Sequence, residues 1–520
     1  MKSIVGSLLL LFMGLSLQAQ QIQSISSPAE TYAESITPED FLAHLSFLAD
    51  DMLEGRETGE RGQRLAAAYI RTQFMRLGLA PGVPQDNSYF QYYYINRSNT
   101  SSGEIKLGNK TYRFGEDFYN YRSALPESLT GEFVFGGYGI QTEAYDNLTG
   151  LDVKDKIVLI LGGMPGQDKI EDRYALLKDW RVRQENIEKM GARAMVMIVP
   201  SELSRTMKRY ARRRSMTIAA SPKPGMPVIY LNPQMGKDLI GQVKGKPEKI
   251  KASLAEDANP PKLKFNKLDF SMSAQSEFSS VAASNVLALL EGTDKKEEII
   301  VLTAHYDHIG VTKDGRVNNG ADDDGSGTTA ILELAEAFAK AAADGNRPRR
   351  SLLFMTVSGE EKGLLGSGFY TDHPVYPLEN TVANLNIDMI GRTDARYAEK
   401  ADSANYVYLI GADKLSSELH EISEAANKDF TQITLDYKYN DEKDPNRFYY
   451  RSDHYNFAKN DIPVIFYFTG VHVDYHKPTD DVEKINRDKA AHITKLVFHT
   501  AWELANREER IVVDKKSKQE

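Results

Sequence analysis

Apolar runs alternate with a strongly periodic helical pattern in the second half of the chain. The segments "NVLALLEG" and "EEIIVLTAH" have the composition of strands, and "SLLFMTVS" is a continuous apolar run, as in a strand buried on both faces. Between the last two, "SGTTAILELAEAFAKA" repeats apolar residues at helical spacing. Further strands are expected in "TVANLNIDMIG", "NYVYLIGA" and "IPVIFYF", and helices over 415–428 and 487–506. This alternation predicts an α/β fold in which helices cover both faces of a sheet.

An earlier segment, from about residue 131, predicts a smaller mixed domain. Short apolar strands such as "KDKIVLILGG", "ARAMVMIVP" and "MPVIYLN" surround one clear helix, and Pro260 and Pro261 then mark a linker. Two helical patterns, "SITPEDFLAHLSFLADDMLEG" and "GQRLAAAYIRTQFMRLG", precede it, and Leu65 and Phe74 are expected on the buried face of the second. We expect a main domain built from 31–125 and 259–510, with 126–258 inserted as a smaller α+β domain.

The N-terminus "MKSIVGSLLLLFMGLSLQAQQ" has the features of a signal peptide. Lys2 is followed by an apolar core that is short for a membrane span, and small residues surround Ala19. We therefore expect residues 1–20 to be removed and the protein to be exported, to the periplasm or out of the cell. No second long apolar run follows, so no stable membrane span is expected after cleavage.

Composition narrows the chemistry further. The 520 residues include no cysteine, which excludes thiol catalysis and thiolate metal ligands. The formal net charge of -9 argues against nucleic acid as the main partner. Neither property indicates an oligomeric state.

Acids and histidines stand where the predicted strands end. His305 and Asp307 follow one run, Glu360 and Glu361 another, and Asp388 closes a third, while His476 lies in the loop "GVHVDYHKPTDD". Because the carboxyl ends of strands in such a sheet are where ligands bind, these side chains are expected to converge. So many carboxylates repel one another unless divalent cations neutralise them. Carboxylate and imidazole ligands suit zinc, with cobalt or manganese as alternatives.

The segment "GADDDGSG", residues 320–327, carries three adjacent aspartates between a predicted strand and its helix. One of them is expected to bridge two metal ions, because a carboxylate has two oxygens. Alternatively, the three acids cap the following helix. His308 and His472 compete with the other histidines as ligands.

Five motifs in this order resemble the family of exported di-zinc aminopeptidases that contains bacterial leucyl aminopeptidases and vacuolar aminopeptidase Y. They are "AHYDHIG", "GADDDGSG", "SGEEKGLLGS", "NIDMIGR" and "DYHKPTDD". The N-terminal helical patterns are also similar to that family, and the inserted segment resembles the protease-associated domain often found in it. The resemblance implies a zinc-exopeptidase type of α/β sandwich around a mixed central sheet.

The resemblance also implies a role for each matching residue. His305 and Asp388 would bind the first metal, Glu361 and His476 the second, and Asp323 both. Glu360 would be the general base, and Asp307 would orient His305. A cis peptide bond is implied between Asp323 and Asp324.

The implied activity is removal of N-terminal residues from peptides that have a free N-terminus, by two metal ions, most readily Zn²⁺, and a glutamate base. The alternatives are a carboxypeptidase or dipeptidase, a glutaminyl cyclase on the same scaffold, and a receptor-like protein without catalysis. Arg447 and Arg451 keep the carboxypeptidase alternative open, because that activity needs a cation for a C-terminal carboxylate.

Overall fold

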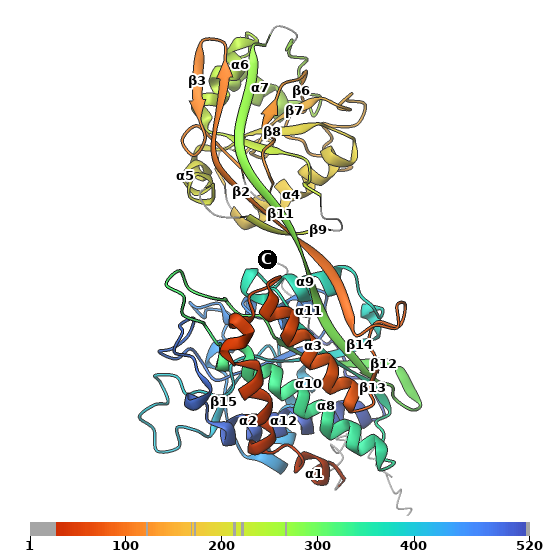
Figure 1. Ribbon diagram of the computed structural model, residues 1–520. Coiled ribbons are helices and arrows are strands. Elements are labelled where there is room, and N and C mark those ends of the chain that lie inside the picture. The colour runs from red at the N-terminus through yellow and green to blue at the C-terminus, as the bar shows by residue number, and fades with distance from the viewer. Residues whose placement is uncertain are drawn as a thin grey trace, which may run out of the picture.

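Two long antiparallel strands, β2 (Phe90–Leu107) and β11 (Phe270–Leu290), run through both parts of the molecule. In Figure 1 they connect a larger lower body with a smaller upper body. The computed structural model describes residues 28–120, 123–167, 169–170, 173–211, 215–219, 223–265 and 268–515. The predicted signal peptide, residues 1–20, lies outside the described residues.

The main sheet is mixed, as predicted; its central strands form the centre of the lower body, and its β3 end lies in the upper body (Figure 1). Its order is β16-β15-β17-β14-β12-β13-β11-β2-β3. The four central strands are parallel to one another, whereas β11 and β15 pair with their neighbours β13 and β17 in the antiparallel sense. The other strands of this sheet are β12 (Lys295–His305), β13 (Arg350–Val357), β14 (Thr381–Ile387), β17 (Val464–Phe468), β15 (Tyr406–Ile410), β16 (Thr434–Asp436), β3 (Lys110–Arg113), β1 (Ala80–Pro81), β5 (Ser128–Leu129) and β9 (Ser215–Ala219).

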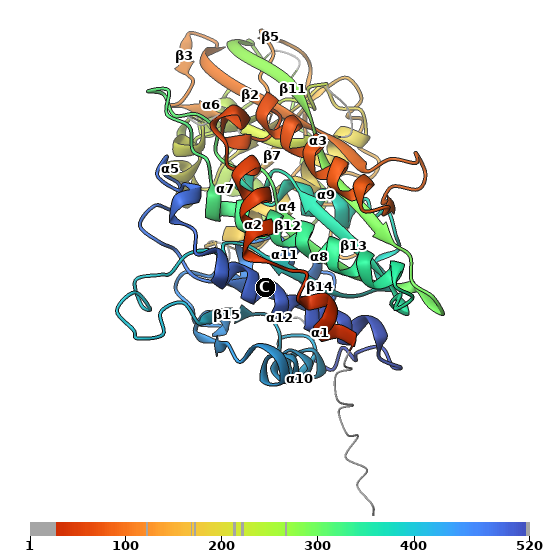
Figure 2. The same ribbon diagram turned by 60° about the horizontal axis from the view of Figure 1, so that its bottom comes forward.

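Helices cover both faces of this sheet, which confirms the predicted fold class. One face packs against α1 (Pro28–Ala33), α2 (Pro38–Leu48), α3 (Arg61–Arg76), α8 (Gly327–Ala343), α10 (Ser417–Ala426) and α12 (Arg487–Asn506), several of which lie in front of the strands in Figure 2. The other face packs against α9 (Leu365–Asp372) and α11 (His454–Ala458). Alternate residues of β12 serve the two cores, since Ile300 and Leu302 face the first and Val301 faces the second.

The first of these cores depends on aromatic packing around α8. Phe338 is fully buried, and its ring centroid lies 4.6 Å from that of Phe498 and 5.9 Å from that of Trp502 on α12. We expect Phe338→Ala to lower the free energy of unfolding by about 3–5 kcal/mol, because it leaves a cavity between two helices and the sheet. Urea unfolding followed by circular dichroism measures this. Phe47, which is 39% exposed on α2, provides the matched control, and an equal loss for Phe47→Ala would contradict the assignment of the core.

The upper body has its own sheet, ordered β4-β10-β8-β7-β6. All its strands except β4 are parallel; the bounds are β4 (Phe118–Tyr119), β10 (Val228–Leu231), β8 (Ala194–Ile198), β7 (Ile157–Leu161) and β6 (Phe133–Phe135). One hydrophobic core lies under α4 (Arg173–Lys189) and α5 (Ser201–Tyr210), and another under α6 (Pro233–Gln242) and α7 (Pro247–Glu256). The core under α6 and α7 also contains Ile105 from β2 and Met272 from β11. The predicted boundaries of the inserted domain, residues 126 and 258, stay a prediction, and these contacts favour a domain that also includes parts of β2 and β11.

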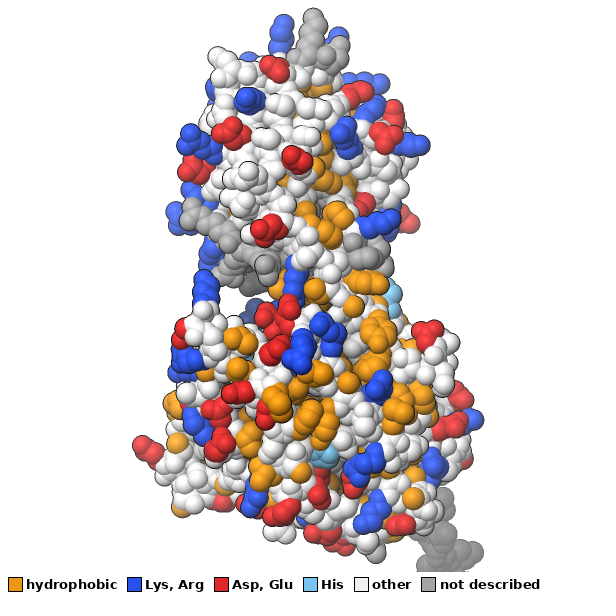
Figure 3. All heavy atoms as spheres, in the orientation of Figure 1, with side chains coloured by type: hydrophobic (Ala, Val, Ile, Leu, Met, Phe, Trp, Pro, Cys, Tyr) orange, Lys and Arg blue, Asp and Glu red, His pale blue; other side chains and the backbone are white. Residues whose placement is uncertain are grey.

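On the face seen in Figure 3, acidic and basic side chains are interspersed over both bodies. Among the described helices, none combines the length and the apolar character that a membrane span requires.

Candidate metal centre

The candidate site lies where the parallel strands of the main sheet end. His305 is the last residue of β12, Asp388 follows β14 directly, and Glu360 begins the short helix η3 (Glu360–Lys362) after β13. The carboxyl ends of parallel strands meet at one edge of a sheet. The structure thereby brings together side chains that are far apart in the sequence.

One group of possible ligands consists of His305, Asp323 and Asp388, whose ligand atoms all lie within 4.8 Å of one another. The Nε2 atom of His305 is 3.3 Å from Asp323 Oδ1 and 3.7 Å from Asp388 Oδ1. All three side chains are buried. This is the geometry expected of a cation site at the carboxyl ends of β12 and β14.

A second group shares Asp323 and adds His308 and Glu361. The Nδ1 atom of His308 lies 2.9 Å from Glu361 Oε1. His476 reaches the same two carboxylates, since its Nε2 atom is 3.1 Å from Asp323 Oδ2 and 3.2 Å from Glu361 Oε2. Asp323 is therefore common to both groups, and the structure brings His308 as well as the expected His476 to the second one.

The segment η2 (Ala321–Ser326), whose backbone is not helical at Asp323 and Asp324, gives the three aspartates different environments. The side chain of Asp324 accepts hydrogen bonds from the backbone N–H groups of His305, Gly327 and Met389. Asp322 Oδ1 accepts a hydrogen bond from Gly391 N at 2.6 Å. Asp324 thus serves the start of α8, as the capping alternative predicts, whereas Asp323 faces the two groups. The Asp323–Asp324 peptide bond is cis, which confirms what the resemblance implies.

Two residues outside the predicted set support this loop. Arg56, at the end of η1 (Asp51–Arg56), is 1% exposed and donates to the carbonyl oxygens of Tyr306, Asn319 and Gly320 at 2.8, 2.6 and 2.9 Å. Asp480 Oδ2 accepts hydrogen bonds from the backbone N–H groups of Asp322 and Asp323. The sequence placed Arg56 only within a segment that resembles the family's N-terminal helices, and Asp480 only within a motif.

Asp307 connects the histidine with the candidate base. Its backbone carbonyl lies 3.0 Å from His305 Nδ1, and its carboxylate lies 3.8 Å from the same atom. The carboxylate accepts hydrogen bonds from Glu360 N and Thr58 Oγ1. Asp307 is therefore placed to fix the orientation of His305 through its carbonyl and the position of Glu360 through its carboxylate.

Burial and neighbouring charges strongly perturb these groups. Burial raises the pKa of Glu360 well above its usual value, and the nearby carboxylates of Glu361 and Asp388 add to the rise. Burial also acts to lower the pKa of His305, but the carboxylates of Glu360, Asp323 and Asp388 outweigh it and hold that pKa well above its usual range. The concentration of carboxylates at one buried point favours a cation there.

The residues present fit divalent metal ions. Their donor atoms are carboxylate oxygens and imidazole nitrogens, which zinc accepts, and the chain contains no thiolate competitor. Within the described part of the chain, Asp323 Oδ2 is buried without a well-formed hydrogen bond. A buried carboxylate oxygen in that state is costly unless a cation or another partner satisfies it.

Comparison with known proteins identifies this part of the chain. Residues 285–501 match the model of Peptidase family M28. That segment is similar to peptidase family M28. The five motifs lie within this segment, so the match confirms the resemblance to the zinc aminopeptidase family.

Several named proteins are similar to the M28 segment and its surroundings. Aminopeptidase YwaD of Bacillus subtilis is 26% identical over 241 residues, which cover 45% of this chain and 47% of the relative. A probable leucine aminopeptidase of Arthroderma otae is 30% identical over 227 residues, covering 42% and 57%. The chain thus spans about half the length of these curated relatives. A solved aminopeptidase from Aneurinibacillus sp. strain AM-1 aligns over 94% of this chain and 98% of its own, with 20% identity and a TM-score of 0.47.

Proposed function

We propose that this protein is a metallo-aminopeptidase that removes N-terminal residues from peptides with the help of two divalent metal ions. Zinc is the metal that we propose for both positions. The observation that carries the proposal is Asp323, which is shared by two buried groups of metal-type ligands in an M28 segment. His305 and Asp388 would hold one ion with Asp323, and Glu361 and His476 the other. His308 is a further candidate for the second position.

The chain's own residues supply the proton transfer in this proposal. Bound zinc would act as a Lewis acid that polarises the peptide carbonyl and lowers the pKa of a water molecule. Glu360 takes a proton from the attacking water and gives it to the leaving amine. Its carboxylate faces the cluster, with Oε2 3.9 Å from His305 Nε2, and its raised pKa suits a group that must both accept and release a proton.

The same carboxylates favour recognition of a substrate's free amine. An ammonium group can pair with the spare oxygens of Glu360 or Glu361, and a neutral amine can bind a metal ion directly. A carboxypeptidase would instead need a cation that faces the cluster. Arg451 is exposed, with its guanidinium 4.8 Å from the centroid of the Phe448 ring, and is the residue to test for that role.

The substrate prediction follows from this amine recognition. We expect unblocked peptides to be cleaved and N-acetylated peptides of the same sequence to be cleaved at least about 100-fold more slowly, because acetylation removes the charge and the lone pair of the amine. Mass spectrometry of timed digests, with and without a chelator, measures this. Efficient removal of C-terminal residues from acetylated peptides, abolished when Arg451 is changed to glutamine, would replace the aminopeptidase proposal with a carboxypeptidase.

We also propose that the chain is exported and that residues 126–258 are an inserted protease-associated domain. The signal-peptide pattern of residues 1–20 supports the first proposal. The separate sheet of the upper body supports the second. N-terminal sequencing of the protein secreted or released from the periplasm by its source cells tests export, since a chain that starts after about residue 20 is expected.

A further inference from the structure

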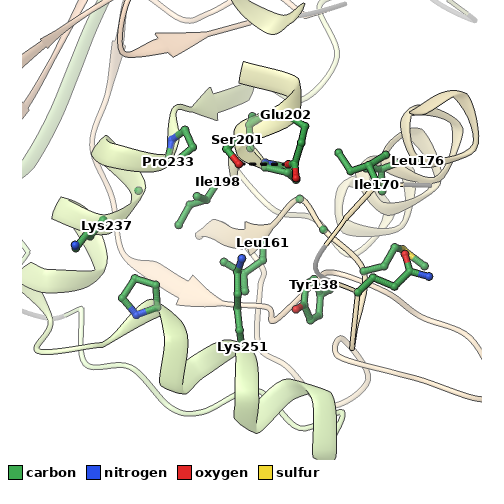
Figure 4. Close-up of a pocket in the computed structure, with 18 of the residues that line it drawn as sticks. Tyr138, Leu161, Ile170, Leu176, Ile198, Ser201, Glu202, Pro233, Lys237 and Lys251 are labelled. Atoms are coloured by element: carbon green, nitrogen blue, oxygen red, sulfur yellow. Dashed lines mark hydrogen bonds between the residues drawn. The ribbon is translucent and has the colours of Figure 1, made fainter. Parts of the chain in front are cut away.

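A cavity of about 620 Å³ opens in the upper body, far along the chain from the metal ligands. Its walls come from the carboxyl ends of β7 and β8 and from helices α4 to α7, and Figure 4 shows several of the lining side chains. Cavities of this size at the carboxyl ends of parallel strands are common sites for small ligands. None of the residues assigned to the metal centre lines it.

The floor of the cavity is apolar. Leu161, Leu176, Ile198 and Ile240 line it, and most of their surface is withdrawn from solvent. Gly236 also lines it, where a Cβ atom would come within 2.5 Å of Ile198 Cγ2, so helix α6 can approach the strand closely only with glycine there. The floor is thus suited to an apolar group rather than to a hydrated ion.

A buried arginine holds the walls in place. The Nη1 atom of Arg183 donates to the carbonyl oxygens of Tyr138, Leu161 and Gly163, and Nη2 pairs with Asp179. Trp180 Nε1 adds a hydrogen bond to Gly162 O at 2.7 Å. Five of these partners line the cavity and Arg183 itself is 1% exposed, so the cavity is preformed rather than opened by a ligand.

The charges in the cavity are not balanced equally. Asp179 is paired with Arg183, Glu202 accepts a hydrogen bond from Ser201 Oγ, and Glu248 lies in the first turn of α7, where the helix dipole favours an acid. Lys251 reaches from α7 into the space opposite Ser201 and Glu202 in Figure 4, and within the described residues no carboxylate forms an ion pair with it. Lys169 and Lys237 also line the cavity and form no ion pair with a described residue, so three lysines without an ion pair outnumber the two such carboxylates, Glu202 and Glu248. The uncompensated charge of the cavity is therefore positive.

We propose that this cavity binds the C-terminal residue of a peptide, with the free carboxylate on Lys251 and the apolar side chain against the floor. A carboxylate and an apolar body match the lysine and the floor, and the amide side chains of Gln167 and Gln234 at the cavity wall can pair with the peptide's backbone. A fatty acid has the first two features but cannot use the amides. The inference goes beyond the proposed catalytic activity and does not depend on it.

Calorimetric titration of the metal-loaded, full-length protein tests this with acetyl-Ala-Ala-Phe and its C-terminal amide. We expect the acid to bind and the amide to bind about 10-fold more weakly, because the amide loses a charge-assisted hydrogen bond. Lys251→Gln is expected to bind the acid no better than the amide. Equal affinities of acid and amide for the unchanged protein would overturn the proposal.

Two glycine variants locate the binding. At Gly163 the nearest heavy atom to an added Cβ is 3.7 Å away, so Gly163→Leu fills the cavity without a backbone clash and is expected to abolish binding of the acid. Gly241→Leu, on α6 outside the cavity and with no heavy atom within 4 Å of the added Cβ, is expected to change nothing. Binding that survives Gly163→Leu would place the ligand elsewhere and overturn the proposal. Octanoate or free phenylalanine that binds as tightly as the acetylated peptide would overturn the peptide assignment.

Discussion

Glu360→Gln is expected to lower turnover by about 10²–10⁴-fold while the metal content of the protein stays nearly unchanged. Glutamine keeps the shape of the side chain but cannot take a proton from water. The residue contributes to neither group of possible ligands, although its carboxylate lies 3.9 Å from His305 Nε2. Steady-state kinetics on an unblocked peptide, combined with elemental analysis of the same sample, separates the two effects.

The neighbouring residue provides the matched control. Glu361 lies in the second ligand group, with its Oε2 atom 3.2 Å from His476 Nε2. Glu361→Ala is therefore expected to lose one metal ion per chain as well as activity. If Glu360→Gln lost metal and Glu361→Ala kept it, the roles of these adjacent residues would have to be exchanged.

Asp323→Ala is expected to have the largest effect, because it removes the carboxylate shared by both groups. Metal content should fall from about two ions per chain to less than one, and peptide cleavage should become undetectable. Asp388→Ala is expected to remove one ion only, since Asp388 belongs to a single group. Asp314→Ala, an exposed acid in the loop after β12, should leave both ions in place.

Metal content also shows whether His476 or His308 is the histidine ligand of the second ion. His476→Ala is expected to lower metal content by one ion, whereas His308→Ala should retain both ions if His308 only supports Glu361. Loss of an ion from His308→Ala together with full retention by His476→Ala would assign the ligand to His308. Two full ions in Asp323→Ala would contradict the shared position of Asp323 altogether.

Strands and helices with a strong apolar pattern were predictable from the sequence. The helix expected over 326–341 is α8 at Gly327–Ala343, and "SLLFMTVS" is β13 at Arg350–Val357. Of the two strands that connect the bodies, β11 was predictable only at its apolar end, "NVLALLEG", because the strand extends to 21 residues through the polar stretch "SMSAQSEFSS". Its backbone pairing with β2, rather than side-chain hydrophobicity, accounts for that length.

Leu65 illustrates a limit of helical periodicity. It was expected on the buried face of α3 but is 37% exposed, while Ala66, Ile70 and Phe74 are buried. The prediction for Leu65 was wrong because the helix packs closely through alanines, which a pattern of large apolar residues does not reveal. Phe74 was placed correctly because it lies at the centre of the same face.

The candidate site was predictable as a set of residue types at strand ends, but not as a geometry. Nothing in "ADDDG" distinguishes the middle aspartate by composition; backbone N–H groups hold its two neighbours and leave Asp323 to face the clusters. Arg56 lies 250 residues from Tyr306, whose carbonyl it binds, and such a long-range clamp leaves no local pattern. Its partners are backbone carbonyl oxygens, which every residue has, so the types of the side chains do not predict these contacts.

The most direct test of the proposed two-metal centre is a crystal structure of the metal-loaded protein with anomalous diffraction recorded above and below the zinc absorption edge. The account predicts two anomalous peaks on either side of the Asp323 carboxylate, one beside His305 and Asp388 and the other beside Glu361 and His476. A single peak, or peaks that do not contact Asp323, would contradict it.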